Sequence, residues 1–371
     1  MKKDDVFDAI LEAEVVPELP RQAMGRTLPF ARAKARVSVE DIYRLSQAAE
    51  KPTELILQAA CAGADELAAA LRSLDGKPYR GFALLYAAQK ADKLVAEDPN
   101  KALTLARLLC EEAASLPPAN SKERISTPAP RQAVQAEAAL LESQALLQKG
   151  EANSAREAVR PARDLFRESG DLGFGAALCD YYEGAAIAFE KDYAAAERLL
   201  KRALAIFAEF GQDHLVGRAG AAIGGMLAQK GDFVRALPHF DRALGVLDPV
   251  VEPQRVTMAL NNKATTLMRV ERFDEARATF AKALNLARRH GFASHAYFVR
   301  TGLAELDFRR GEYRRALRAF TEIVRGASPL ASKAELLFSR LYAAECQARL
   351  GSYGPMAAEI EALRRERQEH P

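Results

Sequence analysis

The stretch RRGEYRRALRAF, from Arg309 to Phe320, sets a pattern that recurs along much of the chain. Similar pieces are KGDFVRALPHF, VERFDEARATF and EKDYAAAERLL, which begin at Lys230, Val270 and Glu190. In each piece an aromatic residue stands three positions before an alanine, and a large apolar residue follows the alanine by four. A fixed period over most of a chain predicts a repeat protein. The alanine position is occupied, at steps of 40 or 41 residues, by Ala155, Ala196, Ala236, Ala276, Ala316 and finally Met356.

Two further positions in each period indicate a pair of packed helices. Five residues before the alanine position a glycine often occurs, which predicts a helix end with a left-handed backbone. Twelve residues before it the side chain is always small, and we expect the two helices to cross there. Large residues such as Phe240 and Phe280 would then fill the space toward the next pair. The glycines are Gly150, Gly231, Gly311 and Gly351, and the small residues are Ser143, Gly184, Gly224, Ala264, Ala304 and Ala344.

Length and composition favour a helical array over one closed core. A chain of 371 residues exceeds what a single hydrophobic core usually organises. A solenoid escapes this limit because each unit packs only on its neighbours. Alanine, leucine, glutamate and arginine dominate and tryptophan is absent, which is typical of helices with thin, alanine-lined contacts. High alanine and arginine usage also suggests a bacterial source.

Charge, cysteines and motifs exclude several classes of function. The net charge is only +3, and positive and negative residues are interleaved along the chain, so we expect no nucleic-acid partner. The four cysteines lie far apart and are predicted to be reduced core thiols of a cytoplasmic protein. We find no apolar run long enough for a signal peptide or a membrane span. No metal-ligand spacing, phosphate-binding loop or nucleophile motif occurs, so we expect no metal, no cofactor and no enzymatic activity.

The chain divides into four predicted regions. Residues 1–76 form an N-terminal helical cap or small helical module, 77–116 a degenerate first helical hairpin, 117–130 a proline-rich exposed loop and 131–371 six repeats. The loop is either functional or a passive spacer.

Local signals predict the helices of the first two regions. We expect a helix over Asp5–Val16, a helix capped by Ser38 that breaks at Pro52, a helix over Tyr79–Ala96, and one that starts at Asp98.

These repeats resemble the tetratricopeptide repeat. Gly224, Gly231, Phe233, Ala236, Phe240 and Ala243 match its small, glycine, aromatic and alanine positions. The family's usual period is about 34 residues, and here it is about six longer. Longer versions are similar to the repeats of kinesin light chains, of the aspartate-phosphatase and peptide-pheromone receptors of bacilli, and of large ATP-dependent transcription regulators. The resemblance implies an all-α fold, a right-handed α-solenoid of helical hairpins whose first helices line a concave groove.

The resemblance also implies where a partner binds. The most informative feature is the pair Asn261 and Asn262 within a predicted helix. Asparagine is a poor helix former, so two in succession need a reason. Nearby arginines would contact a carboxylate of the ligand. The alternative is that these are solvated polar residues, or that they bond to a neighbouring helix. The candidate partner-binding residues are Tyr181, Tyr182, Arg218, Asn261, Asn262, Arg269, Thr301 and Glu305.

A second candidate surface is a run of arginines, Arg309, Arg310, Arg314, Arg315 and Arg318. Such a run can contact phosphates, but acidic residues are interleaved with it. A solvated helix face is therefore the favoured interpretation.

We therefore expect a non-enzymatic scaffold or adaptor that binds a protein or a peptide in the groove. The alternative is a regulatory receptor whose N-terminal helices act as an output module on a kinase, a sigma factor or DNA. The sequence indicates neither the identity of the partner nor the oligomeric state.

Overall fold

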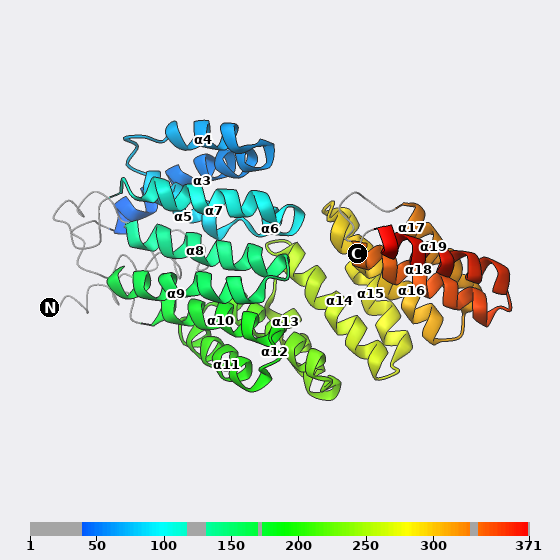
Figure 1. Cartoon of the computed structure of the whole chain (residues 1–371). Helices are drawn as coiled ribbons and strands as arrows, with labels where there is room; N and C mark the ends of the chain where they lie inside the picture. Colours follow the sequence, from blue (N-terminus) through cyan, green and yellow to red (C-terminus); the bar gives the residue numbers. More distant parts are fainter. Residues whose placement is uncertain (1–38, 117–130, 170–172, 327–332, 370–371) are drawn as a thin grey trace. The chain divides into compact units, whose positions relative to one another are not determined.

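The computed structural model describes the chain over four ranges, and every regular element with defined bounds in them is a helix (Figure 1). The prediction of an all-α fold is thereby confirmed. The expected helix over Asp5–Val16, the capping residue Ser38 and the loop 117–130 lie outside the described residues. The described ranges are 39–116, 131–169, 173–326 and 333–369.

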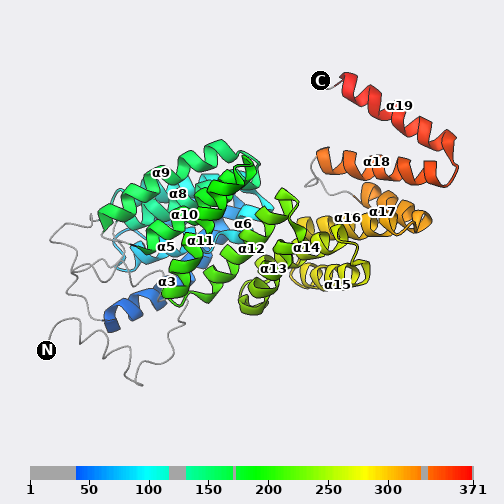
Figure 2. The same ribbon diagram turned by 90° about the horizontal axis from the view of Figure 1, so that it is seen from below.

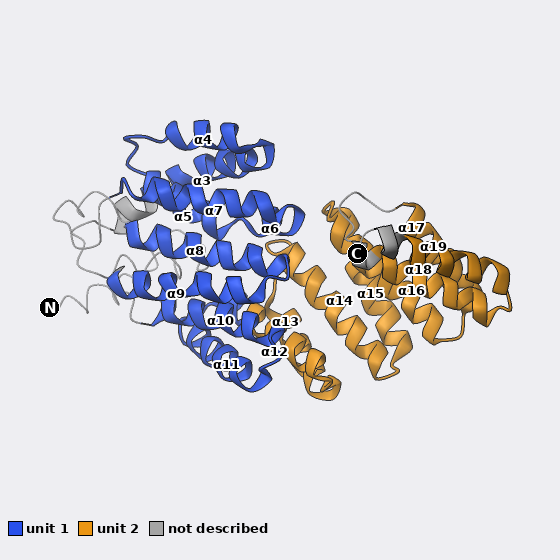
Figure 3. Cartoon of the chain, viewed as in Figure 1, with its two compact units in different colours: residues 1–216 blue, residues 217–371 orange. Residues whose placement is uncertain are grey.

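The chain forms two compact units, coloured separately in Figure 3. The boundary falls between Val216 and Gly217, within helix α12 (Asp213–Lys230). Each unit is built from helices that pack in tandem on their neighbours along the chain (Figure 2).

Unit 1 begins with a long helix, α3 (Val39–Ala62), followed by α4 (Ala64–Arg72). The break expected at Pro52 is wrong, because α3 runs through that residue. Proline removes one backbone donor from a helix, but the rest of the turn is held by tertiary packing. The adjacent Thr53 is fully buried, and its hydroxyl donates to the carbonyl oxygen of Ala49 at 2.7 Å. Helix α3 packs against α4 and against the helices that follow.

The helix expected over Tyr79–Ala96 is two helices, α5 (Arg80–Gln89) and α6 (Asp92–Glu97). The next helix, α7 (Pro99–Ala113), starts where expected: the Asp98 carboxylate accepts hydrogen bonds from the first backbone N–H groups of the helix. Helices α3 and α4 both contact α7, and α3 also contacts α5. The N-terminal helices therefore pack directly on the first hairpin.

The remaining helices alternate regularly as hairpins. Unit 1 continues with α8 (Arg131–Gln148), α9 (Ala152–Ser169), α10 (Phe174–Phe189) and α11 (Tyr193–Glu209). Unit 2 contains most of α12, then α13 (Phe233–Val246), α14 (Pro253–Arg269), α15 (Phe273–Arg289), α16 (Ala293–Arg309), α17 (Tyr313–Arg325), α18 (Lys333–Arg349) and α19 (Tyr353–Glu369).

Small residues lie where helices approach closely, as the pattern predicts. A Cβ atom added to Gly224 of α12 would lie 3.0 Å from the ring of Phe240 in its own hairpin. A Cβ atom on Gly302 of α16 would lie 2.6 Å from the ring of Phe280, in the preceding hairpin. Large residues at this repeated position therefore pack within their own hairpin, as Phe240 does, and against the next hairpin, as Phe280 does. Every alanine of the repeated position, from Ala155 to Ala316, is fully buried, while Met356 in the last hairpin is half-buried.

The turn between the two helices of a hairpin uses a left-handed residue. The predicted glycines, for example Gly231 with φ of 88°, adopt this conformation. In two hairpins a residue with a side chain takes the same place, namely Lys191 with φ of 67° and Glu271 with φ of 60°. A left-handed backbone costs a residue with a Cβ atom roughly 1–2 kcal/mol. These two turns are therefore locally strained.

The prediction for the cysteines is only half right. Cys179 and Cys346 are buried and free, and burial raises the pKa of the Cys179 thiol to about 12. Cys61 and Cys110 are free but exposed. The residues before them, Ala60 and Leu109, are buried. Successive side chains of a helix differ in direction by about 100°, so the two thiols point away from the core.

We expect Glu271→Gly to raise the free energy of unfolding by about 0.5–1 kcal/mol. Glycine removes the strain of the left-handed backbone, and its greater freedom in the unfolded chain cancels part of the gain. Urea unfolding followed by circular dichroism measures the change. The control is Lys282→Gly in the exposed interior of α15, which is expected to lower stability by about 1 kcal/mol. Equal destabilisation by both substitutions would contradict the interpretation.

Candidate partner-binding face

The first helices of the last three hairpins lie side by side, since α14 contacts α16 and α16 contacts α18. Residues spaced by three, four, seven and eleven positions share one side of a helix. The residues at these spacings recur from helix to helix at steps of 40, and we call the surface they form the α14–α16–α18 face. Its members are Met258, Asn261, Asn262, Thr265 and Arg269 on α14, Phe298, Thr301, Gly302, Glu305 and Arg309 on α16, and Phe338, Leu341, Tyr342, Glu345 and Arg349 on α18.

The asparagine pair lies in the middle of α14. Asn262 is exposed, whereas Asn261 is half-buried and its Oδ1 atom is buried with no hydrogen-bond partner among the described residues. The threonine hydroxyls one turn later donate to the backbone carbonyl oxygens of the two asparagines, at 3.0 Å from Thr265 and 2.7 Å from Thr266. These bonds leave the side-chain amides of the asparagines uninvolved.

Glu305 joins two helices of the face and is largely buried. Its Oε1 atom accepts a hydrogen bond from Nε of Arg309 at 2.8 Å and lies 3.7 Å from Nη2 of Arg269. One carboxylate oxygen thus faces two guanidinium groups. On α18 the corresponding pair is exposed, with Nη2 of Arg349 at 3.1 Å from Oε1 of Glu345. The hydrogen bond from Arg349 to Glu345 raises the pKa of that guanidinium.

The face also carries exposed apolar side chains. Phe298 is 43% exposed, Phe338 36% and Leu341 48%. The rings of Phe338 and Tyr342 lie 4.5 Å apart, and Tyr342 also contacts Phe308. Burial, and next the charge of Glu305, raise the pKa of the Tyr342 hydroxyl. Tyr342 is therefore a neutral group between the apolar and the charged residues of the face.

Three predicted residues have partners inside their own unit. In unit 1, Tyr181 and Tyr182 are buried with ring centroids 5.0 Å apart, and the Tyr182 hydroxyl donates to Gln144 at 3.3 Å. In unit 2, Arg218 is buried, and its Nε atom donates to Oε1 of Glu252 at 2.7 Å. The guanidinium group of Arg218 is thus already paired with a carboxylate.

The other five predicted residues, Asn261, Asn262, Arg269, Thr301 and Glu305, belong to the α14–α16–α18 face. The hydroxyl of Thr301 donates to the carbonyl oxygen of Tyr297 at 3.1 Å. The 40-residue rows were the available signal for Arg309 and Arg349, because both repeat the position of Arg269. The prediction placed Arg309 only in the arginine run.

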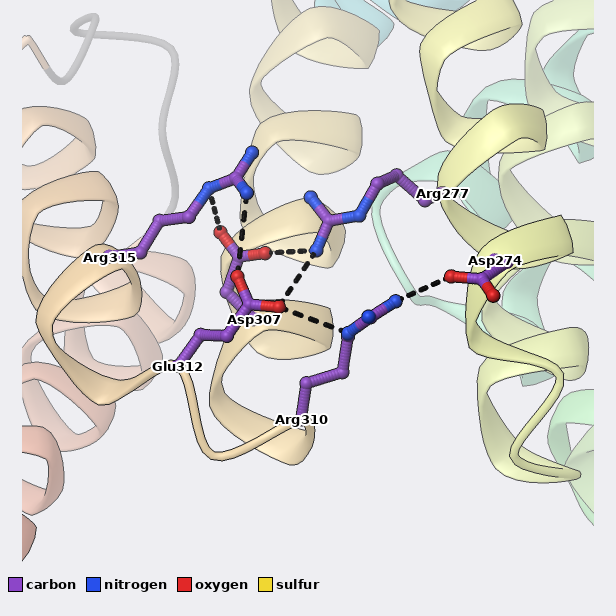
Figure 4. Close-up of polar contacts among 6 residues, drawn as sticks. All are labelled: Asp274, Arg277, Asp307, Arg310, Glu312 and Arg315. Carbon is purple, nitrogen blue, oxygen red and sulfur yellow. Dashed lines mark hydrogen bonds and ion pairs between the residues drawn. The ribbon is translucent and has the colours of Figure 1, made fainter.

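Two members of the arginine run, Arg310 and Arg315, take part in a network of ion pairs that joins α15, α16 and α17 (Figure 4). The carboxylate of Asp307, on α16, is buried between Arg277 of α15 and Arg315 of α17. Around this centre Arg310 binds Asp274 at 2.6 Å and Glu312 at 3.0 Å. Positive and negative groups are balanced, which favours a role in holding the hairpins together.

The described residues indicate neither a membrane span nor a metal site. No helix there is long and apolar enough to cross a membrane. The described part of the chain contains no group of three histidine, cysteine or acidic residues arranged for a metal ion. Burial, with the nearby Arg255 charge, lowers the pKa of His295 to about 4, so this imidazole is neutral at ordinary pH.

The arrangement defines the class of protein as an α-solenoid of helical hairpins. The family model for the tetratricopeptide repeat matches residues 255–328, which comprise α15, α16, α17 and most of α14. Over these residues the chain contains tetratricopeptide repeats. A search of curated proteins finds no match.

Solved structures share the fold at low sequence identity. A Rap protein complexed with competence and sporulation factor has a TM-score of 0.55 and 14% identity, covering 89% of this chain and 93% of that chain. The apo form of RapI has a TM-score of 0.52 and 12% identity, covering 85% and 86%. Aspartyl phosphate phosphatase F from Bacillus subtilis has a TM-score of 0.51 and 15% identity, covering 81% and 75%. These likenesses establish the fold.

We expect Asp307→Asn to lower the free energy of unfolding by roughly 1–3 kcal/mol. Removing one charge from a buried ion pair leaves the others uncompensated, and partial exposure of Arg277 and Arg315 moderates the loss. Thermal unfolding followed by circular dichroism measures it. The matched control is Asp274→Asn at the exposed edge of the same network, which is expected to change stability by less than about 0.5 kcal/mol. Equal effects of the two substitutions would show that burial of Asp307 is unimportant.

Proposed function

We propose that this protein is a scaffold or adaptor that binds a protein or peptide segment on the α14–α16–α18 face. The observation that carries the proposal is the asparagine pair on α14, where Asn262 is exposed and the buried Oδ1 of Asn261 has no partner among the described residues. A buried acceptor without a partner costs about 1–3 kcal/mol. A rotation of the Asn261 side chain that brings this atom to a ligand N–H group would remove that cost.

The mechanism is binding without chemistry. The amide of Asn262 offers a donor and an acceptor together, which suits the alternating N–H and C=O groups of an extended peptide. Phe298, Phe338 and Leu341 offer apolar contacts on the neighbouring helices. Because the helices are already stacked on one another, little conformational entropy is lost when the ligand binds.

The fold comparison supports a binding role. The Rap protein of similar fold was solved in complex with competence and sporulation factor, so a chain of this architecture holds a bound factor in at least one case. At 14% identity the likeness carries no residue of that site over to this chain. We therefore argue the position of the site from the α14–α16–α18 face alone.

A regulatory receptor is the second proposal. In this version the bound segment changes how the N-terminal helices act on a further partner. Helices α3 and α4 pack on α7, and α3 also packs on α5, which favours a role as a cap for the first hairpin over a separately folded output module. A mobility-shift measurement of the full chain on mixed genomic DNA fragments tests the DNA-binding form, and we expect no shift at micromolar protein.

We expect Asn262→Ala to lose partners that the wild-type chain captures from its native cell extract. Loss of hydrogen bonds to the ligand backbone should weaken binding about tenfold or more. Quantitative mass spectrometry of parallel pull-downs measures the ratio for each captured protein. The matched control is Asn285→Ala, an exposed asparagine on α15 outside the face. A set of captured partners unchanged by Asn262→Ala would rule out this face as the binding site.

A further inference from the structure

The α14–α16–α18 face carries two parallel rows of different chemistry. The first row is apolar and the second is basic, and both repeat at steps of 40 residues. Within each helix the rows are eleven residues apart, which corresponds to about 16 Å along the helix axis. The apolar row is Met258, Phe298 and Phe338, and the basic row is Arg269, Arg309 and Arg349.

The basic row is short of negative charge at its α14 end. Glu305 offers one oxygen to both Arg309 and Arg269, and the distance to Arg269 is long, at 3.7 Å. The side chain of Arg269 is 42% exposed. A second carboxylate would give Arg269 a partner of its own. At the other end, the pair between Arg349 and Glu345 is exposed, and pairs of this kind are worth less than about 1 kcal/mol. Arg349 is therefore free to exchange partners at little cost.

A purely structural role also accounts for part of the basic row. All three arginines lie in the last turn of their helices, where the helix dipole favours a positive charge. That role explains the presence of a cation on each helix. It does not explain why the exposed phenylalanines recur on the same side of the same helices.

The apolar row is exposed where a soluble surface would normally be polar. Phe298 and Phe338 occupy one repeated position on adjacent helices, and Leu341 lies one turn beyond Phe338. Tyr342 stands between the two rows, with its ring against Phe338 and its hydroxyl influenced by the charges of Glu305, Arg309 and Arg269. The surface thus changes from apolar to basic over about 16 Å along the helix axes.

We propose that the face selects a peptide segment that is both acidic and apolar, with carboxylates on the basic row and aromatic or aliphatic side chains on the apolar row. This inference rests on the proposed function and adds the chemistry of the partner to it. The two rows are about 16 Å apart, a distance that an extended segment of about five residues covers along its own length. One segment can therefore touch both rows at once.

The test is selection of a phage-displayed library of random 12-residue peptides on the immobilised full chain. Wild-type protein should recover sequences in which aspartate and glutamate are enriched at least threefold over the starting library, together with phenylalanine and leucine. Selection on Arg269→Gln should lose the acidic enrichment, because within the described part of the chain the ion pair of this exposed arginine is the long contact to Glu305. Selection on Phe298→Ser should lose the apolar enrichment. The control is Arg314→Gln, an exposed arginine on α17 outside the face, which should recover the same peptides as the wild type.

Recovered peptides are then resynthesised with free and with amidated carboxyl ends, and their affinity is measured by fluorescence anisotropy at low and high salt. Binding that weakens at least tenfold in Arg269→Gln and also weakens with salt supports the proposal. If amidation of the carboxyl end is enough to abolish this binding, the carboxylate that contacts the basic row is the one at the peptide terminus. Recovery of neutral or basic peptides, or of acidic peptides indifferent to Arg269→Gln, overturns it. If such peptides still depend on Asn262, the binding face stands and only the partner chemistry is wrong. Recovery of no peptide above background overturns the partner chemistry, and the pull-down with Asn262→Ala then decides the face separately.

Discussion

The close approach of a small residue to a large ring is the contact on which the hairpin array depends. Gly224 allows the ring of Phe240 to lie against the backbone of α12, and Gly302 does the same for Phe280 from the preceding hairpin. A bulky side chain in a contact this tight costs roughly 1–3 kcal/mol. The small residue at the position of Gly224 recurs every 40 residues, as Ala264, Ala304 and Ala344, and this sets the helices of unit 2 in a regular order. That order is what aligns equivalent side chains of α14, α16 and α18 into rows.

The sequence predicts this framework well because its cause is local and periodic. The buried alanines, the glycines in the left-handed turns and the residues at the crossing points all follow from spacing alone. Even Lys191 and Glu271 fall on the predicted turn position, although neither is a glycine. Periodicity failed where a tertiary contact overrides a local preference. Helix α3 continues through Pro52 because Thr53 and Ile56, on one side of this turn, are buried, and no local signal reports that burial.

The binding residues were harder to predict, because a surface position does not reveal its partners. Arg218 occupies on α12 the repeated position that Met258 occupies on α14. Its guanidinium group is nevertheless paired with Glu252, which lies 34 residues further on in the turn before α14. Tyr181 and Tyr182 contribute aromatic packing within unit 1. Asn261 and Asn262 differ from these residues because no side-chain partner balances them among the described residues. Only the structure separates polar groups that are satisfied from polar groups that are not.

The first helices of the two units differ in how some of their polar groups are paired. In unit 1, Gln89 donates to Glu137 and Gln144 donates to Asp92, although Phe189 of α10 is exposed there as well. In unit 2 the corresponding helices expose phenylalanines and share one carboxylate between two arginines. A surface whose polar groups are mutually satisfied gains little from a ligand, because each new contact must replace an old one. The amide of Asn261 and the shared carboxylate of Glu305 are therefore the polar groups that favour our proposal of a binding site on the α14–α16–α18 face.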